Sequence, residues 1–212
     1  MNYFNILKTA NYFNKLAQGD FCFFVDMDET LLFSFDIGPV RAKELENDAY
    51  VKVVPWGKSN IYGCIKRPHA DEFLTELNKL GKVSLVTASP PDYAQAMLAA
   101  QDLNKYFDKI YTGADLTGVV KENCEQFFLI DNADISSDVI NSKMQMLGVE
   151  TQLPEESQVY DWSEEESRTF QNEAQDRVAE HHISVADFNG NLNDVGLIKV
   201  MNEIKQRLSS SF

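Results

Sequence analysis

The chain has 212 residues, 44% of them hydrophobic, which is enough to bury the core of one domain with room for a small insertion. Its 33 acidic and 19 basic residues give a formal charge of −14, which argues against the Lys- and Arg-dependent binding of nucleic acid. The sequence contains no apolar stretch close to the roughly 20 residues that a membrane span requires. We therefore expect neither nucleic acid nor a membrane as a partner.

The three cysteines, Cys22, Cys64 and Cys124, are few and odd in number. Their spacing is unlike that of zinc ligands, so we expect them to be reduced thiols. Reduced thiols in turn predict a cytoplasmic, reducing compartment.

Taken in chain order, the first strong element is the apolar run at 21–25, which is typical of a strand buried on both faces. It ends in the polar sequence Asp-Met-Asp-Glu-Thr at 26–30. Residues 36–65 mix Gly and Pro with short apolar stretches and predict a small hairpin insertion. Its best strand candidate is 50–54.

The patterns then predict a helix over 69–80, a buried strand over 83–86, a helix from Pro90 to about residue 102 and a buried strand over 127–130. Strands that alternate with helices favour parallel pairing. The expected class is therefore α/β, with a central parallel sheet flanked by helices and a last helix near 192–208.

Polar side chains follow each of the three buried strands. Asp26 and Asp28 follow the first, Thr87 the second, and Asp131 and Asn132 the third. The carboxyl ends of parallel strands share one crevice in an open sheet, so these side chains should converge there. The period-two geometry of an extended chain places Asp26 and Asp28 on the same side.

This set of side chains suits the hydrolysis of a phosphate monoester. One carboxylate can attack phosphorus and form an aspartyl-phosphate, while the second protonates the leaving group and then activates water. Mg²⁺ takes oxygen ligands and reduces the repulsion between the nucleophile and the phosphate oxygens. We therefore predict a Mg²⁺-dependent phosphatase with Asp26 as its nucleophile.

At this point the motifs resemble a known group of enzymes. Residues 26–32 are similar to the first motif of the haloacid dehalogenase superfamily, which implies its Rossmann-like fold. Segments 66–74 and 86–94 resemble the small C-terminal-domain phosphatases, also called NLI-interacting-factor-like, which are related to phosphatases of the RNA polymerase II tail. Residues 131–132 match the fourth motif of that family, and 183–194 resemble its last strand and helix.

The resemblance implies roles for particular residues. Asp26 would be the nucleophile and a metal ligand, and Asp28 would be the general acid/base with its backbone carbonyl on the metal. Asn132 would complete the protein ligands of Mg²⁺, with Asp131 as a support. Thr30 would brace the loop.

The resemblance also implies a phosphate-binding group. Thr87 and Ala88 would bind phosphate oxygens, together with a lysine. Lys121 is the expected lysine because its Gly-Val-Val-Lys setting is similar to that of the family, and Lys109 is its rival.

The whole chain is expected to form one domain with two insertions, a small hairpin at 36–65 and an acidic helical insert at 133–182. Residues 155–180 hold nine acidic and two basic side chains, so we expect this part to lie beside the sheet, away from an anionic substrate. The expected substrate is a phosphoserine or phosphothreonine protein. The alternatives are a small phosphate ester such as a nucleotide or sugar phosphate, with the insert closing over it, and a non-catalytic binding module.

Overall fold

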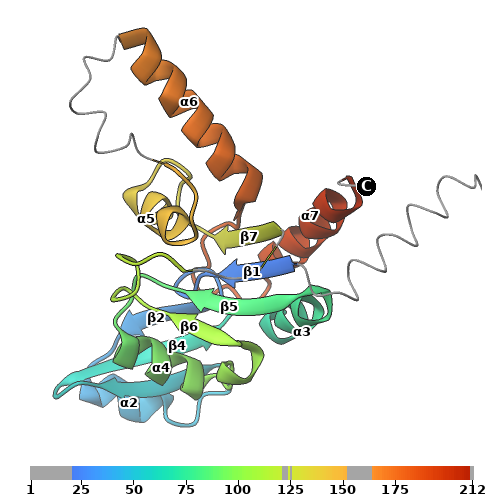
Figure 1. Ribbon diagram of the computed structural model, residues 1–212. Helices are drawn as coiled ribbons and strands as arrows, with labels where there is room; N and C mark the ends of the chain where they lie inside the picture. The colour runs from blue at the N-terminus through green and yellow to red at the C-terminus, as the bar shows by residue number, and fades with distance from the viewer. Residues whose placement is uncertain (1–20, 121–123, 125, 152–163, 211–212) are drawn as a thin grey trace, which may run out of the picture.

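The computed structural model describes residues 21–120, 124, 126–151 and 164–210. It contains a five-stranded sheet in the order β6-β5-β1-β7-β8, with all four pairings parallel, and a three-stranded antiparallel sheet in the order β2-β4-β3 (Figure 1). The predicted α/β class with a central parallel sheet is confirmed.

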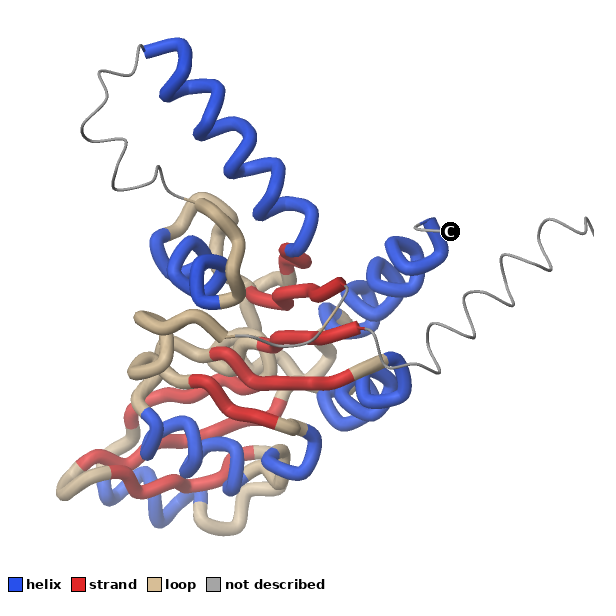
Figure 2. Tube along the Cα trace, viewed as in Figure 1, coloured by secondary structure: helices blue, strands red, loops and turns tan. Residues whose placement is uncertain are grey.

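Figure 2 distinguishes the helices from the strands along the chain. The strands are β1 (Phe21–Val25), β2 (Leu32–Asp36), β3 (Val51–Trp56), β4 (Asn60–Lys66), β5 (Lys82–Val86), β6 (Lys109–Tyr111), β7 (Gln126–Asp131) and β8 (His182–Ser184). The helices are α2 (Pro39–Leu45), α3 (Ala70–Leu80), α4 (Pro91–Ala100), α5 (Asp138–Met146), α6 (Glu164–His181) and α7 (Gly196–Ser210), with a 3-10 turn at Asn104–Tyr106. None of the helices described is long and apolar enough to cross a membrane.

The central strand β1 explains the packing of both faces of the large sheet. Phe21, Phe23 and Val25 belong to one apolar cluster, which includes side chains of α3, α4 and α7. Cys22 and Phe24 belong to a second cluster with side chains of α5 and α6. Because successive side chains of a strand point to opposite faces, a strand covered on both faces must be apolar throughout, as β1 is.

The register of β1 brings the polar strand ends together. Val25 pairs with Leu85 of β5 on one side and with Ile130 of β7 on the other. All three strands run in the same direction, so the residues that follow them emerge at the same edge of the sheet. Asp26, Thr87 and Asp131 are therefore neighbours although they span about half of the sequence.

The small sheet lies between the first motif and α3, and it is larger than the sequence suggested. The predicted strand at 50–54 is found as β3, whereas β2 begins before the predicted insertion and helix α2 within it was not predicted. Helix α2 begins at Pro39, whose fixed φ favours a first helical turn. It buries only Leu45, so it lacks the long apolar stripe by which a helix is recognised from its sequence.

Helix α6 extends outward from the body of the molecule (Figure 1). It is attached through contacts with β7 and β8, with Ala174 and Val178 buried. Near this end, Arg177 Nε donates a hydrogen bond of 3.2 Å to the carbonyl oxygen of Glu150. The attachment of α6 thus lies at the β7–β8 edge of the large sheet.

Two of the three cysteines form a disulfide, so the expectation of three reduced thiols is wrong for that pair. Cys22 and Cys124 are joined, with their Cα atoms 5.9 Å apart. Cys22 pairs in register with Phe127, so the chain that leads into β7 passes beside it. The two cysteines are 102 residues apart, and only the pairing of β1 with β7 reveals their proximity. Cys64 is free and buried.

A buried arginine joins the first motif to the C-terminal segment. Arg67 makes a bidentate pair with Asp194, with Nε–Oδ1 and Nη2–Oδ2 distances of 2.7 and 3.1 Å. Its Nη2 also donates to the carbonyl oxygen of Ala186 at 2.7 Å, and its Nη1 to those of Thr30 and Glu29 at 3.1 and 3.3 Å. Burial acts to raise the pKa of Asp194, but the hydrogen bonds from Arg67 and the Gly196 amide hold it below its usual value.

Substituting Arg67 with Met is therefore expected to destabilise the fold by about 3–5 kcal/mol, because Asp194 and three carbonyl groups lose their partner. Urea unfolding of the variant and the wild type at neutral pH would measure the loss. The two proteins should have the same m-value, which is the slope of the free energy of unfolding against urea concentration. Arg41→Met is the matched control, since Arg41 forms only an exposed pair with Glu44 and should change stability by less than about 1 kcal/mol. Equal stability of the two variants would contradict this assignment.

Candidate active site

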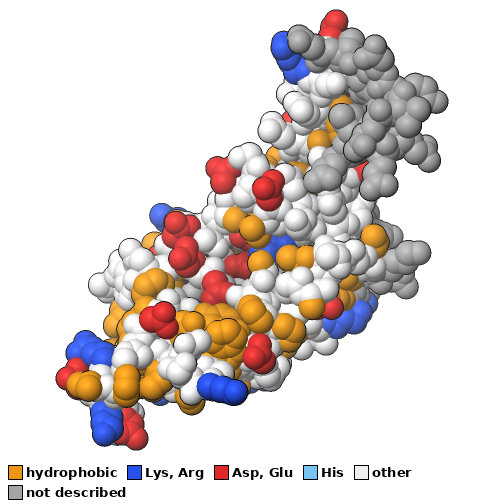
Figure 3. Space-filling view, turned by 90° about the vertical axis from the view of Figure 1, so that its left-hand side faces the viewer, with side chains coloured by type: hydrophobic (Ala, Val, Ile, Leu, Met, Phe, Trp, Pro, Cys, Tyr) orange, Lys and Arg blue, Asp and Glu red, His pale blue; other side chains and the backbone are white. Residues whose placement is uncertain are grey.

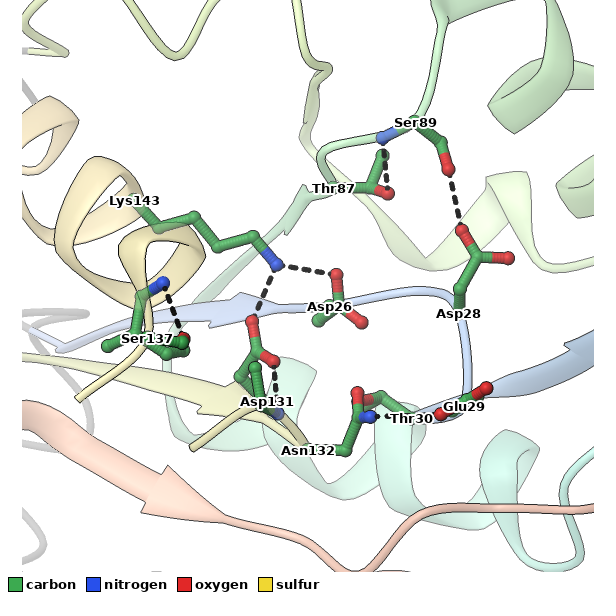
Figure 4. Close-up of polar contacts among 12 residues, drawn as sticks. Asp26, Asp28, Glu29, Thr30, Thr87, Ser89, Asp131, Asn132, Ser137 and Lys143 are labelled. Carbon is green, nitrogen blue, oxygen red and sulfur yellow. Dashed lines mark hydrogen bonds and ion pairs between the residues drawn. The ribbon is translucent and has the colours of Figure 1, made fainter. Parts of the chain in front are cut away.

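The site centres on Asp26, which follows β1 at the carboxyl edge of the large sheet. Its amide donates a 2.9 Å hydrogen bond to the Ile130 carbonyl of β7, which fixes its backbone. Only 6% of the residue is exposed. Lys143 Nζ lies 2.6 Å from Asp26 Oδ1 and 2.5 Å from Asp131 Oδ2, so one ammonium joins two buried carboxylates (Figure 4).

Lys143 comes from α5, within the insert, and was not predicted. Its helix begins at the cap Ser137, whose hydroxyl accepts a 3.2 Å hydrogen bond from the Ile140 amide. One signal was available in the sequence. Lys143 shares the helical spacing of the buried Ile140 and Met144, and a lysine in such a stripe requires a buried anionic partner.

The two lysines that the sequence suggested are not in this position. Lys121 lies outside the described residues. Lys109 is exposed at the start of β6, where it pairs with Ser84, two residues before the carboxyl end of β5. Among the lysines that the structure describes, Lys143 is the one that lies beside Asp26.

Electrostatics at this centre leave an excess of negative charge. The pKa of Asp26 is raised to about 7, with burial as the largest cause. Within this net value, the Lys143 ammonium acts to lower the pKa and the Asp131 carboxylate acts to raise it. Burial acts to lower the pKa of Lys143, but Asp26 and Asp131 raise it above its usual value, so this group stays an ammonium. Two carboxyl groups thus share one fixed positive charge.

The second carboxyl group of the motif, Asp28, is held by two hydroxyl groups. Ser89 Oγ donates to Asp28 Oδ2 at 2.7 Å, and the Tyr93 hydroxyl donates to Asp28 Oδ1 at 3.3 Å. Ser34 Oγ lies 2.5 Å from the Tyr93 hydroxyl oxygen. Burial raises the pKa of Asp28, although the bonds from Ser89 and Tyr93 lower it. Asp28 therefore takes up a proton more readily than an exposed aspartate does.

The backbone after β1 explains why both carboxyl groups face the site. Met27, between them, is fully buried in the core, as the alternation of an extended chain predicts. Glu29 has a φ of 59°, and the amides of Leu31 and Leu32 both donate to the Met27 carbonyl oxygen. Because of this tight turn, the chain leaves the direction of β1 directly after Asp28.

The remaining predicted residues surround the same centre. The hydroxyl oxygen of the buried Thr87 accepts a 3.1 Å hydrogen bond from the Ser89 amide. Ala88, which lies between these two residues, is exposed. Thr30 Oγ donates to Asn132 Oδ1 at 2.9 Å, which links the turn after β1 to the end of β7. Figure 4 shows Thr87, Thr30 and Asn132 around Asp26.

The donor atoms at this centre fit a magnesium ion. Within the described residues, no group of three or more His, Cys, Asp or Glu side chains could hold a metal by itself. Mg²⁺, however, binds proteins through one or two carboxylates, and phosphate and water complete its shell. Asp26, the Asp28 carbonyl and Asn132 offer only oxygen, and the unbalanced charge of Asp26 and Asp131 favours a cation.

Two of the hollows lined by described residues differ in their relation to this chemistry. The larger, about 790 Å³, lies between the amino end of β7 and helices α6 and α7. Its histidine, His181, stacks on Phe127 and donates Nδ1–H to the Phe127 carbonyl oxygen at 3.1 Å. The smaller, about 360 Å³, is bordered by Asp28 and Ser89. The smaller hollow therefore adjoins the second carboxyl group of the motif.

A family model and several known proteins are similar to this chain. The model of the NLI interacting factor-like phosphatase family matches residues 21–136, more than half of the chain. A putative CTD phosphatase-like protein of Invertebrate iridescent virus 3 is 36% identical over 70 residues, which are 33% of this chain and 38% of that protein.

Solved structures with similarity include Fcp1, an essential RNA polymerase II CTD phosphatase, with a TM-score of 0.49 and 14% identity over 96% of this chain. The HAD domain of the Legionella pneumophila effector Lem4 has a TM-score of 0.40 and 10% identity over 90% of this chain and 97% of that domain. The chain spans 52% of the Fcp1 chain. By the match to the family model, this chain belongs to the NLI interacting factor-like phosphatases.

Proposed function

We propose that this phosphatase is a Mg²⁺-dependent phosphomonoester hydrolase that works through an aspartyl-phosphate on Asp26. The observation that carries the proposal is the buried Asp26–Lys143 pair, with Asp28 two residues farther along the chain and held by Ser89 and Tyr93. A bound magnesium ion would supply positive charge to the phosphate oxygens, with Asp26, the Asp28 carbonyl and Asn132 as its protein ligands.

In the first step, a carboxylate oxygen of Asp26 attacks phosphorus, and the bond from phosphorus to the ester oxygen breaks. Asp28 gives its proton to the departing alkoxide, which leaves as an alcohol. Lys143 holds Asp26 in position and offers a positive charge to the phosphate oxygens. The Thr87 hydroxyl and the Ala88 amide would bind the same oxygens.

In the second step, water attacks the phosphorus of the aspartyl-phosphate, and the Asp26–phosphorus bond breaks. Asp28, now a carboxylate, accepts a proton from this water. Inorganic phosphate leaves, Asp26 is again a carboxylate and Asp28 is again protonated. The raised pKa of Asp28 supports this double role, because the group must both give and accept a proton near neutral pH.

We further propose a phosphoserine or phosphothreonine protein as the substrate. Two of the similar proteins are described as CTD phosphatases or phosphatase-like. The small β2–β4–β3 sheet stands beside the site, and the described contacts of α6 are at the β7–β8 edge, which favours an accessible site. A nucleotide or sugar phosphatase is the alternative that the following experiment tests.

The protein is expected to hydrolyse an aryl phosphate with added Mg²⁺, to lose activity with a chelator and to regain it when Mg²⁺ is restored. A panel of phosphoserine and phosphothreonine peptides, nucleotides and sugar phosphates, compared by kcat/KM, would identify the substrate class. Preference for a nucleotide or sugar phosphate would favour the alternative. Full activity in excess chelator would overturn the metal dependence.

A further inference from the structure

The hollow beside Asp28 has an unusual lining. We call it the aromatic pocket and define it by the residues Asp28, Glu29, Ser34, Trp56, Tyr62, Ser89, Pro90 and Tyr93. Its volume is about 360 Å³, which is enough for one side chain or a group of similar size. The small sheet supplies Ser34, Trp56 and Tyr62, the turn after β1 supplies the two carboxyl groups, and the start of α4 supplies Tyr93.

One wall of the pocket is a cluster of three aromatic rings. Tyr93 meets both Trp56 and Tyr62 edge to face, with ring centroids 5.5 Å apart in each case and interplanar angles of 81° and 82°. Trp56 and Tyr62 are 6.1 Å apart. Each of the three side chains is partly exposed, so the cluster presents aromatic surface to a ligand. Ring faces carry partial negative charge and attract cations.

The other walls are also electron-rich. Asp28 and Glu29 contribute carboxyl groups, and Ser34 and Ser89 contribute hydroxyl groups. Neither a Lys nor an Arg is among the described residues that line the pocket, and Pro90 is its one aliphatic member. Figure 3, which faces the carboxyl edge of the large sheet, shows a broad hydrophobic patch with several acidic side chains around it and a few basic ones at its margin. The complement of such a surface is a positively charged group with an apolar stem.

We propose that the aromatic pocket binds a positively charged side chain, Arg or Lys, that lies close to the phosphorylated residue of a protein substrate. The inference rests on the proposed function, because Asp28 marks the side of the phosphate from which the alcohol leaves. A side chain near the phosphoresidue lies on that side, next to Asp28 and therefore at the mouth of the aromatic pocket. The charge of −14 for the whole chain also attracts basic segments.

The test uses one phosphoserine peptide of otherwise neutral residues, with Arg placed at each neighbouring position in turn. At every position, Arg is compared with citrulline, which has nearly the same shape but no charge. At one position, kcat/KM should be roughly three- to thirtyfold higher for Arg than for citrulline, as expected for one cation–aromatic contact. Glutamate at that position should be worse than citrulline.

Variants identify the pocket through the ratio of kcat/KM for the Arg peptide to that for the citrulline peptide. Trp56→Leu removes a ring and Glu29→Gln removes a charge, and each should bring this ratio close to one. Glu46→Gln is the matched control, because Glu46 is an exposed acidic residue after α2 that does not line the pocket. It should leave the ratio unchanged.

The outcomes separate the two proposals. If an aryl phosphate is not hydrolysed at all, the proposed function fails. If it is hydrolysed but the Arg and citrulline peptides are equal at every position, or leucine or proline is preferred to Arg, the pocket does not bind a cation and this inference is wrong. Choline phosphate tests a small cationic ester, and a higher kcat/KM for it than for every Arg peptide would overturn the assignment to a protein substrate.

Discussion

An Asp26→Asn protein is expected to lose turnover of an aryl phosphate by about 10⁴-fold or more, because the amide cannot attack phosphorus. The fold should survive, since Asn has nearly the same shape and Lys143 keeps its bond of 2.5 Å to Asp131. Steady-state rates with added Mg²⁺ would measure the loss, and thermal unfolding would check the fold. Acid quenching of the wild type with ³²P-labelled substrate should trap label on the protein, and the variant should trap none.

Asp36→Asn serves as the matched control, because Asp36 is an exposed aspartate at the end of β2. Its rate should equal that of the wild type. A folded Asp26→Asn protein with wild-type turnover, or a trapped label on both proteins, would mean that another group is the nucleophile.

The second large effect is expected for Lys143→Met. The variant keeps a long side chain but leaves Asp26 and Asp131 buried without their shared positive charge. We expect kcat to fall by about 10²- to 10³-fold, the usual effect of removing one group that stabilises charge in the transition state. Turnover of an aryl phosphate, compared at saturating Mg²⁺ and substrate, would measure it.

Stability should fall as well, by about 3–5 kcal/mol at neutral pH. Burial raises the pKa of Asp26 to about 7 even with Lys143 present, and loss of the ammonium raises it further. A carboxyl group with a raised pKa in the folded state destabilises that state as pH rises above its unfolded value. Because both proteins hold Asp26 protonated below about pH 7, this part of the variant's deficit should appear only above about pH 7 and grow as pH rises further, which urea unfolding at several pH values can follow.

Lys109→Met and Lys121→Met are the comparisons for this substitution. Lys109 is exposed at the start of β6, so its loss should change kcat by less than a few-fold. If Lys121→Met abolished turnover while Lys143→Met retained it, the family motif that suggested Lys121 would be right and the role given to Lys143 would be wrong.

The sequence predicted those parts of the fold and site that depend on local patterns. The run at Phe21–Val25 is apolar because β1 is covered on both faces, and the residues directly after it had to reach the carboxyl edge. The positions of Asp26 and Asp28 were therefore predictable from the buried strand before them and from the two-residue alternation of an extended chain. Asp131 was placed beside them by the parallel pairing of β1 with β7.

Other parts depend on how distant elements pack, and no local pattern contains that information. Lys143 reaches Asp26 only because α5 packs over the face of the sheet that also holds Phe24 and Leu129. Tyr93 reaches Asp28 from the start of α4, although the two are 65 residues apart. The bond between Cys22 and Cys124 likewise depends on strand order.

The described residues of the segment 133–182 include helices α5 and α6, which are attached in different ways, so natural variation should affect the two helices differently. Helix α5 carries Lys143 into contact with Asp26, so we expect its length and the face that packs on the sheet to vary little. Helix α6 is anchored by a few apolar side chains near its last turns and projects outward, so its outer turns can change in length and charge at small cost. A fragment cut at residue 136, where the family match ends, would keep Asp26 and lose its cation. A fragment that keeps the Asp26–Lys143 pair must therefore extend through α5.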